Sequence, residues 1–235
     1  MEDFAEKAIG PRGFADREAA GRLLAEKLAA RAFKDPVVLA LPRGGVPVAY
    51  EVAKRLKAPL DLVLVRKIGH PWQPELALGA VVDGAEPQLV RNEEVLATLP
   101  DGEKALAEGE ARELKEIERR RVRYFGDRKR VSVAGRSAIV VDDGIATGAT
   151  MRAALIAVRR LKPARLILAT PVAPADAIAE LSREVDETVC LAMPEPFYAI
   201  GLWYEDFHQL TDEEVVRLLR DAQPEAPSGR GSQGA

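Results

Sequence analysis

The sequence predicts an α/β protein with a mostly parallel sheet that is covered by helices on both faces. Short apolar runs alternate with helix-like segments along most of the chain, and strands of parallel sheets are apolar because both of their faces are buried. Several loops rich in glycine or in charge follow these runs directly. Ligands of such sheets bind beyond the carboxyl ends of the strands, so these loops are the candidate sites.

The first part of the chain predicts a core of two helices and two strands. Leucine and alanine recur at helical spacing near the start, and Asp35-Pro36 ends that helix. Glycine and proline punctuate the segment after the second strand, which predicts a loop. The expected elements are a helix over 16–32, a strand over 37–41, a helix over 46–56, a strand over 60–65, and a loop over 66–74.

The remaining part continues the alternation after a long charged insert. Apolar residues at helical spacing predict one long, partly exposed helix in the insert, and Thr211 is a plausible cap for the last helix. The expected elements are a strand pair over 76–82 and 88–90, the long helix over 93–124, a strand over 137–141, a helix over 150–161, a strand over 165–169, a helix over 175–184, a strand over 188–192, an irregular segment over 193–210, and a helix over 212–220.

Composition excludes several classes of protein. The chain has 235 residues, of which 47% are hydrophobic and 30% charged, and its net charge is −3. This fits a globular protein without a general polyanion-binding surface, so no nucleic-acid partner is expected. Cys190 is the only cysteine, which allows no internal disulfide. The first residues lack the pattern of a signal peptide, and no apolar run approaches the ~20 residues of a membrane span. The cytoplasm is the expected location.

The stretch Ala138–Thr150, AIVVDDGIATGAT, carries the clearest chemical signal. A predicted strand ends in Asp142 and Asp143, and a loop of small and hydroxylated residues then opens a helix. A helix N-terminus offers free N–H groups and a positive dipole end, which suits a phosphate. The two carboxylates would repel that phosphate, so they must face sugar hydroxyls or Mg²⁺. The stretch therefore predicts a sugar-phosphate site; the plain alternative is an acidic strand end followed by a threonine helix cap.

This stretch resembles the signature of the type I phosphoribosyltransferases, which bind 5-phosphoribosyl 1-pyrophosphate (PRPP). It is neither a Walker loop nor a Rossmann GxGxxG. The resemblance implies that Asp142 and Asp143 contact the ribose 2- and 3-hydroxyls and hold Mg²⁺, directly or through water. It also implies that the 5-phosphate is bound by the loop that follows, namely Gly144, Ile145, Ala146, Thr147, Gly148, Ala149 and Thr150.

Two further loops agree with this resemblance. Arg43, Gly44 and Gly45 follow the first core strand and resemble the pyrophosphate loop of the family. The glycines would allow unusual backbone angles and expose N–H groups, and Arg43 would bind phosphate oxygens. Arg66 and Lys67 resemble the basic strand end that faces the pyrophosphate, and Lys67 and Arg43 are expected to act in catalysis. An ordinary turn and a pair of solvated charges are the alternatives, and His70 is a minor candidate.

The region that covers the base, called the hood in this family, is expected after residue 192. Five aromatic residues crowd into positions 197–207, and aromatic faces suit flat ligands. Phe197, Tyr198 and Trp203 are therefore candidates for base binding, and Asp206 (or Glu205) for a second metal contact. A satellite hydrophobic cluster would explain the aromatic residues equally well. The strand over 165–171 lacks the lysine of the 6-oxopurine enzymes, so the base stays unidentified.

The resemblance also sets the expected domains. A type I phosphoribosyltransferase core would span 1–192 and include a helical insert over 93–130; a small hood and a C-terminal helix would span 193–222; and 223–235 has the composition of a disordered tail. The basic run Arg119–Arg123 in the insert either covers the pyrophosphate or forms a solvated face. For the insert as a whole, three roles are open: a solvated surface helix, a subunit contact or a lid.

These expectations describe an enzyme. It would use PRPP and Mg²⁺, transfer the phosphoribosyl group to an unidentified nitrogenous base with release of pyrophosphate, and work as a cytoplasmic homodimer, as the family commonly does. Two alternatives stay open. One is a regulatory protein that binds PRPP or a nucleotide without catalysis, and the other is a sugar-phosphate hydrolase on the same fold.

Overall fold

A five-stranded parallel sheet forms the centre of the molecule. The computed structural model describes residues 13–84, 87–126 and 128–222. The strand order is β2–β1–β6–β7–β8, and every neighbouring pair is parallel. The strands are β1 (Pro36–Ala40), β2 (Leu60–Leu62), β6 (Ser137–Val141), β7 (Arg165–Val172) and β8 (Glu187–Ala192). The expected mostly parallel α/β sheet is confirmed.

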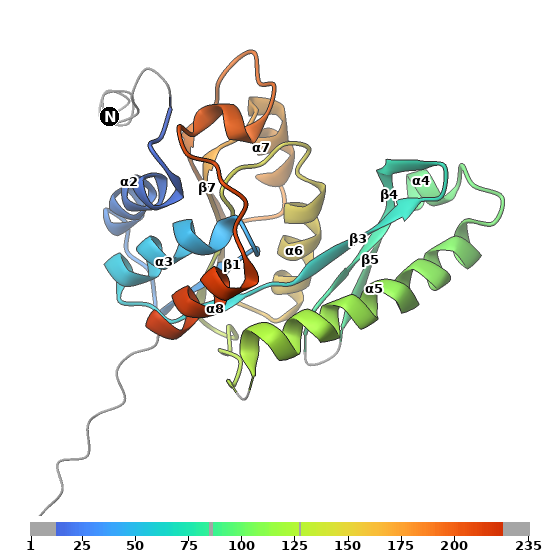
Figure 1. The fold of residues 1–235 in the computed structure, drawn as a ribbon, viewed down its shortest axis with the longest axis horizontal. Helices are drawn as coiled ribbons and strands as arrows, with labels where there is room; N and C mark the ends of the chain where they lie inside the picture. The colour runs from blue at the N-terminus through green and yellow to red at the C-terminus, as the bar shows by residue number, and fades with distance from the viewer. Residues whose placement is uncertain (1–12, 85–86, 127, 223–235) are drawn as a thin grey trace, which may run out of the picture.

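Helices cover both faces of this sheet (Figure 1). In β1, Val38 and Ala40 are buried with one group of helices, and Val37 and Leu39 with the other. This alternation explains why the strand is apolar at every position. The first group comprises α2 (Arg17–Ala29), α3 (Gly45–Leu56) and α8 (Asp212–Asp221); the second comprises α6 (Ala149–Arg160) and α7 (Ala175–Leu181).

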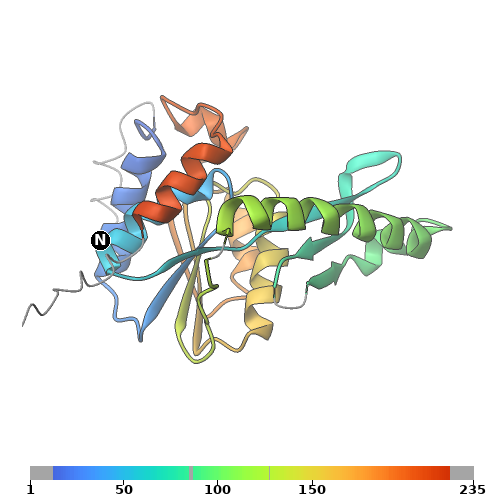
Figure 2. The same cartoon turned by 60° about the horizontal axis from the view of Figure 1, so that its bottom comes forward.

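Residues 65–84 and 87–125 form an arm that extends from the core (Figures 1 and 2). Its antiparallel sheet has the order β3–β4–β5. A short helix and a long helix follow, and the long helix lies along the sheet (Figure 2). The elements are β3 (Val65–His70), β4 (Gln73–Val82), β5 (Gln88–Arg91), α4 (Glu93–Leu96) and α5 (Gly102–Phe125).

The arm corrects two expectations. The predicted loop over 66–74 is wrong, because β3 and the start of β4 occupy it. Gly69 sits at an irregularity in the β3–β4 register and Pro71 lies in the connecting turn, so glycine and proline mark a bulge and a hairpin here. The single helix over 93–124 is also wrong, since α4 and α5 are separate and Pro100 lies between them.

The other elements differ from expectation mainly at their ends. The second core strand stops at Leu62, and α7 stops at Leu181. Thr211 caps α8 as predicted: its side chain accepts from the Glu214 amide, and the Glu214 carboxylate accepts from the Thr211 amide. The expected tail over 223–235 lies outside the described residues. In the described part of the chain, no helix has the length and apolar character of a membrane span.

The parallel arrangement brings the carboxyl ends of the core strands to one edge of the sheet. The Arg43 loop follows β1, the acid pair follows β6, and the hood follows β8. The arm begins at Val65, shortly after β2 ends. All four candidate regions therefore leave the same edge, where ligands of such sheets bind.

Candidate active site

The acid pair packs directly against the two glycines of the Arg43 loop. A Cβ atom on Gly44 would lie 2.1 Å from Oδ2 of Asp143, and one on Gly45 would lie 2.7 Å from the Val141 carbonyl oxygen. Gly44 has φ −57° and ψ −40°, an ordinary right-handed conformation. The expectation that Gly44 provides an unusual backbone angle is therefore wrong. Glycine is needed at Gly44 because the loop and the acid pair approach too closely for a side chain.

Asp143 has a buried partner that the sequence did not reveal. Arg17 donates from Nε to Oδ2 of Asp143 at 2.7 Å, and only 8% of Arg17 and 7% of Asp143 are exposed. The same guanidinium donates to the His208 carbonyl at 2.9 Å and lies 3.9 Å from the Phe207 ring centre. The Tyr204 hydroxyl donates to the Asp143 carbonyl. Asp143 is thus held by α2 and by the hood region.

Asp142 is the more available of the two acids. Its Oδ1 accepts the Asp143 amide at 2.9 Å, and the residue is half-buried, whereas Asp143 is buried. Burial, and then the neighbouring Asp143 charge, hold the pKa of Asp142 well above its ordinary value. Burial also raises the pKa of Asp143, and the hydrogen bond from Arg17 opposes that shift. Arg17 therefore offsets part of the cost of burying an ionised Asp143.

The loop after the acid pair ends at an open helix N-terminus. Gly148 is the N-cap of α6 with φ 77°, and it has no side chain to cap this end. The first N–H groups of a helix have no partner within the helix. Ala146, Thr147 and Ala149 are exposed, whereas Gly144 and Ile145 are buried. The outer part of the predicted phosphate loop is therefore free to bind an anion, and the inner part packs into the core.

A cleft of about 720 Å³ joins the loop after β1, the arm and α6. Cations dominate its wall, and two of them, Arg112 and Arg120, come from α5. The described residues that line it are Pro42, Val65, Arg66, Lys67, Gly69, His70, Pro71, Arg112, Arg120 and Thr150. The volume is in the range of small-molecule sites. The structure thus brings together Arg66, Lys67, His70 and Thr150, which the sequence singled out, with Arg120 of the basic run 119–123. It adds Arg112, which the sequence did not single out.

Lys67 connects this cleft to a second recess. The recess measures about 410 Å³ and lies between the arm and the start of α6, where Thr147, Gly148 and Ala149 line it. Lys67 is the one described cation that lines both spaces. It therefore lies between the predicted pyrophosphate region and the predicted phosphate loop.

Arg43 is turned toward α8. Its guanidinium lies 3.8 Å from the Asp212 carboxylate. Asp212 also pairs with Arg123 at 3.0 Å and accepts from the Tyr124 hydroxyl at 2.6 Å. Arg43 is thus linked to the end of α5, and it is Pro42, beside it, that lines the cleft.

The predicted base-binding residues lie apart from this cleft. Phe197 and Trp203 pack around Phe14 and Tyr204, while Tyr198 is 79% exposed. Asp206 pairs with His208 at 3.2 Å rather than with the acid pair. None of these four residues is among the described residues that line the cleft. The aromatic segment joins the hood to the N-terminal part of the chain, because the Phe14 amide donates to Trp203 and the Glu205 amide to Phe14.

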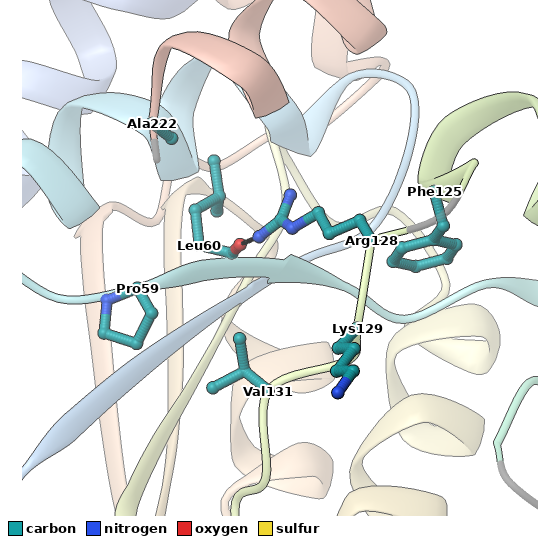
Figure 3. A pocket seen from close by; sticks show the side chains of 7 residues that line it. All are labelled: Pro59, Leu60, Phe125, Arg128, Lys129, Val131 and Ala222. Atoms are coloured by element: carbon teal, nitrogen blue, oxygen red, sulfur yellow. Dashed lines mark hydrogen bonds between the residues drawn. The ribbon is translucent and has the colours of Figure 1, made fainter. Parts of the chain in front are cut away.

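Another cavity, of about 610 Å³, lies at the free edge of β2. Figure 3 shows the Arg128 side chain crossing it toward the Leu60 carbonyl, to which it donates. Its described lining is Pro59, Leu60, Phe125, Arg128, Lys129, Val131 and Ala222. None of these residues carried a chemical signal in the sequence, and the cavity adjoins neither the acid pair nor the α6 N-terminus. The cleft is therefore the better candidate site.

Comparison with known proteins identifies relatives of this chain. The phosphoribosyl transferase domain family matches residues 15–197. Two Mycobacterium tuberculosis proteins, from strains CDC 1551 / Oshkosh and ATCC 25618 / H37Rv, carry a name that proposes phosphoribosyl transferase activity. Each is 47% identical to this chain over 206 residues, which is 88% of this chain. The match covers 46% of each relative, so the chain spans about half of their length.

A solved structure agrees in fold. The protein TT1426 from Thermus thermophilus is 44% identical to this chain, with a TM-score of 0.80. The similarity covers 90% of this chain and 100% of that protein. The arm and the core therefore both have counterparts in a related solved structure.

Proposed function

The chain belongs to the phosphoribosyl transferase family, and we propose that it transfers the phosphoribosyl group of PRPP to a nitrogenous base with release of pyrophosphate. One observation carries the proposal: a carboxylate pair, an uncapped helix N-terminus and a cationic cleft meet at one edge of the sheet. PRPP presents the complementary groups, a diol between a phosphate and a pyrophosphate.

In the proposed complex the 5-phosphate binds the N-terminus of α6. Ala146, Thr147, Gly148, Ala149 and Thr150 supply N–H and hydroxyl donors. Asp142 accepts hydrogen bonds from the ribose hydroxyls. Asp143 is held by Arg17 and thereby fixes the end of β6, from which Asp142 extends. The pyrophosphate binds between the Gly44–Gly45 loop and two cations of the arm, Lys67 and Arg120.

The reaction is a substitution at C1 of the sugar. The bond from C1 to the pyrophosphate oxygen breaks, the leaving group takes the electron pair, and positive charge develops on the ribose. A nitrogen of the base forms the new bond to C1 and releases its proton to solvent. The protein contributes positioning and leaving-group stabilisation, through Lys67, Arg120 and the loop amides.

Mg²⁺ fits this site through Asp142. Mg²⁺ is usually held by one or two carboxylates together with water and substrate phosphates, and the Asp143 carboxylate is already engaged by Arg17. No cluster of three or more His, Cys, Asp or Glu side chains suited to a metal occurs among the described residues, so substrate and water would complete the coordination. When bound, the ion neutralises charge on the pyrophosphate.

The family resemblance further implies a homodimer in the cytoplasm, and we include both in the proposal. Trp72, Tyr198 and Leu202 are large apolar side chains with more than half of their surface exposed, and they are candidates for the subunit contact. Light scattering of the purified chain would test this state.

The decisive test begins with calorimetric titration of PRPP and Mg²⁺, followed by an assay of pyrophosphate release with a panel of bases. Base-dependent release would establish the transferase. Binding without release for any base would favour the regulatory alternative, and release without a base would favour the hydrolase. Asp142→Asn is expected to lose PRPP affinity while circular dichroism stays unchanged; unchanged affinity in that variant would overturn the proposed site.

A further inference from the structure

Two arginine clusters lie on the arm side of the cleft, and Arg66, Arg112 and Arg120 of these clusters line it. In the outer cluster, Glu113 accepts from Arg66 at 2.8 Å and from Arg112 at 3.2 Å. In the inner cluster, Glu116 accepts from Arg119 at 2.8 Å and from Arg120 at 2.7 Å. Each carboxylate is shared by two guanidinium groups, so each cluster keeps one positive charge that no carboxylate of the cluster neutralises.

The inner cluster lies at the Arg43 end of the cleft. Arg120 is one helical turn from Tyr124, whose hydroxyl donates to Asp212, and Asp212 lies 3.8 Å from Arg43. Arg120 and Pro42, the residue before Arg43, both line the cleft. Arg120 is therefore placed to meet a pyrophosphate at the Gly44–Gly45 loop.

The outer cluster lies farther along the arm. Arg112 precedes Arg120 by eight residues on α5, which corresponds to about 12 Å along a helix. The cleft follows β3 from Val65 to Pro71, about 20 Å of extended chain. A pyrophosphate is two linked phosphates and fills only a small part of that length. A bound pyrophosphate at the loop therefore leaves Arg66, His70 and Arg112 for another group.

The chemistry of the outer part does not suit a neutral flat base. His70 is the only aromatic residue among the described residues that line the cleft, and no carboxylate lines it. The aromatic residues of the hood pack around Phe14 or face solvent. Guanidinium groups oriented by a shared carboxylate are instead suited to carboxylate or phosphate oxygens.

We propose that Arg66, Arg112 and His70 bind an acidic group of the acceptor, so that the acceptor is a nitrogen compound bearing a carboxylate or a phosphate. This inference rests on the proposed transferase function, because it assigns the second substrate of the same cleft. Glu113 is then a positioning residue, which holds the two arginines ready for the oxyanion.

A binding experiment tests this without knowledge of the acceptor. Wild type, Arg112→Gln and Arg120→Gln are saturated with PRPP and Mg²⁺, which fills the loop and the α6 site, and are then titrated with inorganic phosphate. We expect a second phosphate site in wild type and Arg120→Gln, weakened about tenfold or more in Arg112→Gln. Arg120→Gln should instead weaken the binding of PRPP. Absence of a second site in wild type, or equal loss of PRPP affinity in both variants, overturns the inference.

Matched acceptors give a second readout. Nicotinate and nicotinamide differ at one acidic group, as do orotate and uracil, and pyrophosphate release is measured with each. We expect the acid of a pair to be preferred, and the preference to fall in Arg112→Gln. If wild type prefers the neutral acceptor of each pair and shows no second phosphate site, the inference is overturned, while the proposed transferase function is retained. Failure of wild type to bind PRPP at all identifies failure of the proposed function instead.

Discussion

Arg17 and Asp143 form a buried ion pair across 126 positions of the chain, with 2.7 Å between Nε and Oδ2. The guanidinium also donates to the His208 carbonyl and lies over the Phe207 ring. One side chain of α2 thus contacts both the end of β6 and the hood region. The position of Asp143, and with it the acid pair, depends on a residue far from the signature motif.

Arg17→Met should destabilise the protein strongly, because it leaves a buried carboxylate without its partner. Removal of one member of a buried pair costs about 3–5 kcal/mol, and Arg17→Lys should cost less, since it keeps the charge but loses the contact with Phe207. Urea unfolding at pH 7.5 measures both. Arg55→Met, which breaks the exposed Arg55–Glu26 pair, is the matched control and should unfold close to wild type. Equal effects of Arg17→Met and Arg55→Met would contradict the structural role of Arg17.

The pH dependence of stability should carry the signature of Asp142. Its pKa is raised in the folded state by burial and by the Asp143 charge, so the folded protein binds this proton more tightly than the unfolded chain. Stability from this group is present below the unfolded pKa of about 4 and is lost as pH rises through the folded pKa. Asp142→Asn should therefore be more stable than wild type at pH 8, and this advantage should vanish near pH 4. Urea unfolding of both proteins across pH 4–8 measures how the stability difference depends on pH. A stability advantage of Asp142→Asn that grows toward acid pH would contradict the prediction.

The same raised pKa has a consequence for ligand binding. A protonated Asp142 cannot accept from ribose hydroxyls or hold Mg²⁺, so PRPP affinity should begin to fall at a higher pH than an ordinary aspartate of pKa about 4 would give. Calorimetric titration of PRPP and Mg²⁺ at a series of pH values measures this. The PRPP phosphates titrate as well, so the same series with Asp142→Asn is the control. Its affinity should fall less toward acid pH than that of wild type, because only the contribution of the phosphates remains.

Gly44→Ala should disrupt the acid pair by collision. The new Cβ would lie 2.1 Å from Asp143 Oδ2, and forcing an extra group into a packed region costs about 1–3 kcal/mol. PRPP affinity should fall with stability, because the displaced carboxylate lies beside Asp142. In an Asp143→Ala background the same substitution should cost clearly less, since the colliding atoms are gone. Full additivity of the two substitutions in urea unfolding would refute the contact.

The predictable part of this molecule follows from local patterns. Buried parallel strands such as β6 are apolar at every position, and AIVVDDGIATGAT joins such a strand to a helix start within one short stretch. A contiguous segment of this kind specifies both structure and chemistry. The core sheet, the position of the acid pair at the end of a strand and the helix start after it were therefore accessible from the sequence, as was the cap at Thr211. The phosphate-binding role of the loop stays a prediction.

The missed features depend on contacts between distant segments. Arg17 occupies a buried position of an amphipathic helix, and nothing around it signals a partner 126 positions away. The arm was hidden because Gly69 and Pro71 suggested a loop; the β3 strand is stabilised by packing of Ile68 against Gly109 on α5. Arg112 looked like one of many charges on a solvated helix, and only the fold shows that it lines the cleft. For the basic run 119–123 the sequence left open a cover over the pyrophosphate or a solvated face, and the fold shows that Arg120 of this run lines the cleft.

Lys67→Met should weaken PRPP binding by about 10- to 100-fold, the value of one hydrogen bond to a charged group. Lys67 lines both the cleft and the recess beside α6, and no carboxylate pairs with it among the described residues, so its full charge is available to a phosphate. The loss should be largest at low ionic strength, because salt screens an exposed charge, and Lys67→Arg should retain most of the affinity. Lys115→Met is the control, since Lys115 is exposed on the same arm but does not line either space. Titration of PRPP and Mg²⁺ at two salt concentrations measures all four proteins. If Lys67→Met and Lys115→Met bind PRPP with the same affinity, the ligand does not reach Lys67 on β3. The cleft between β3 and α6 is then not the place where PRPP binds.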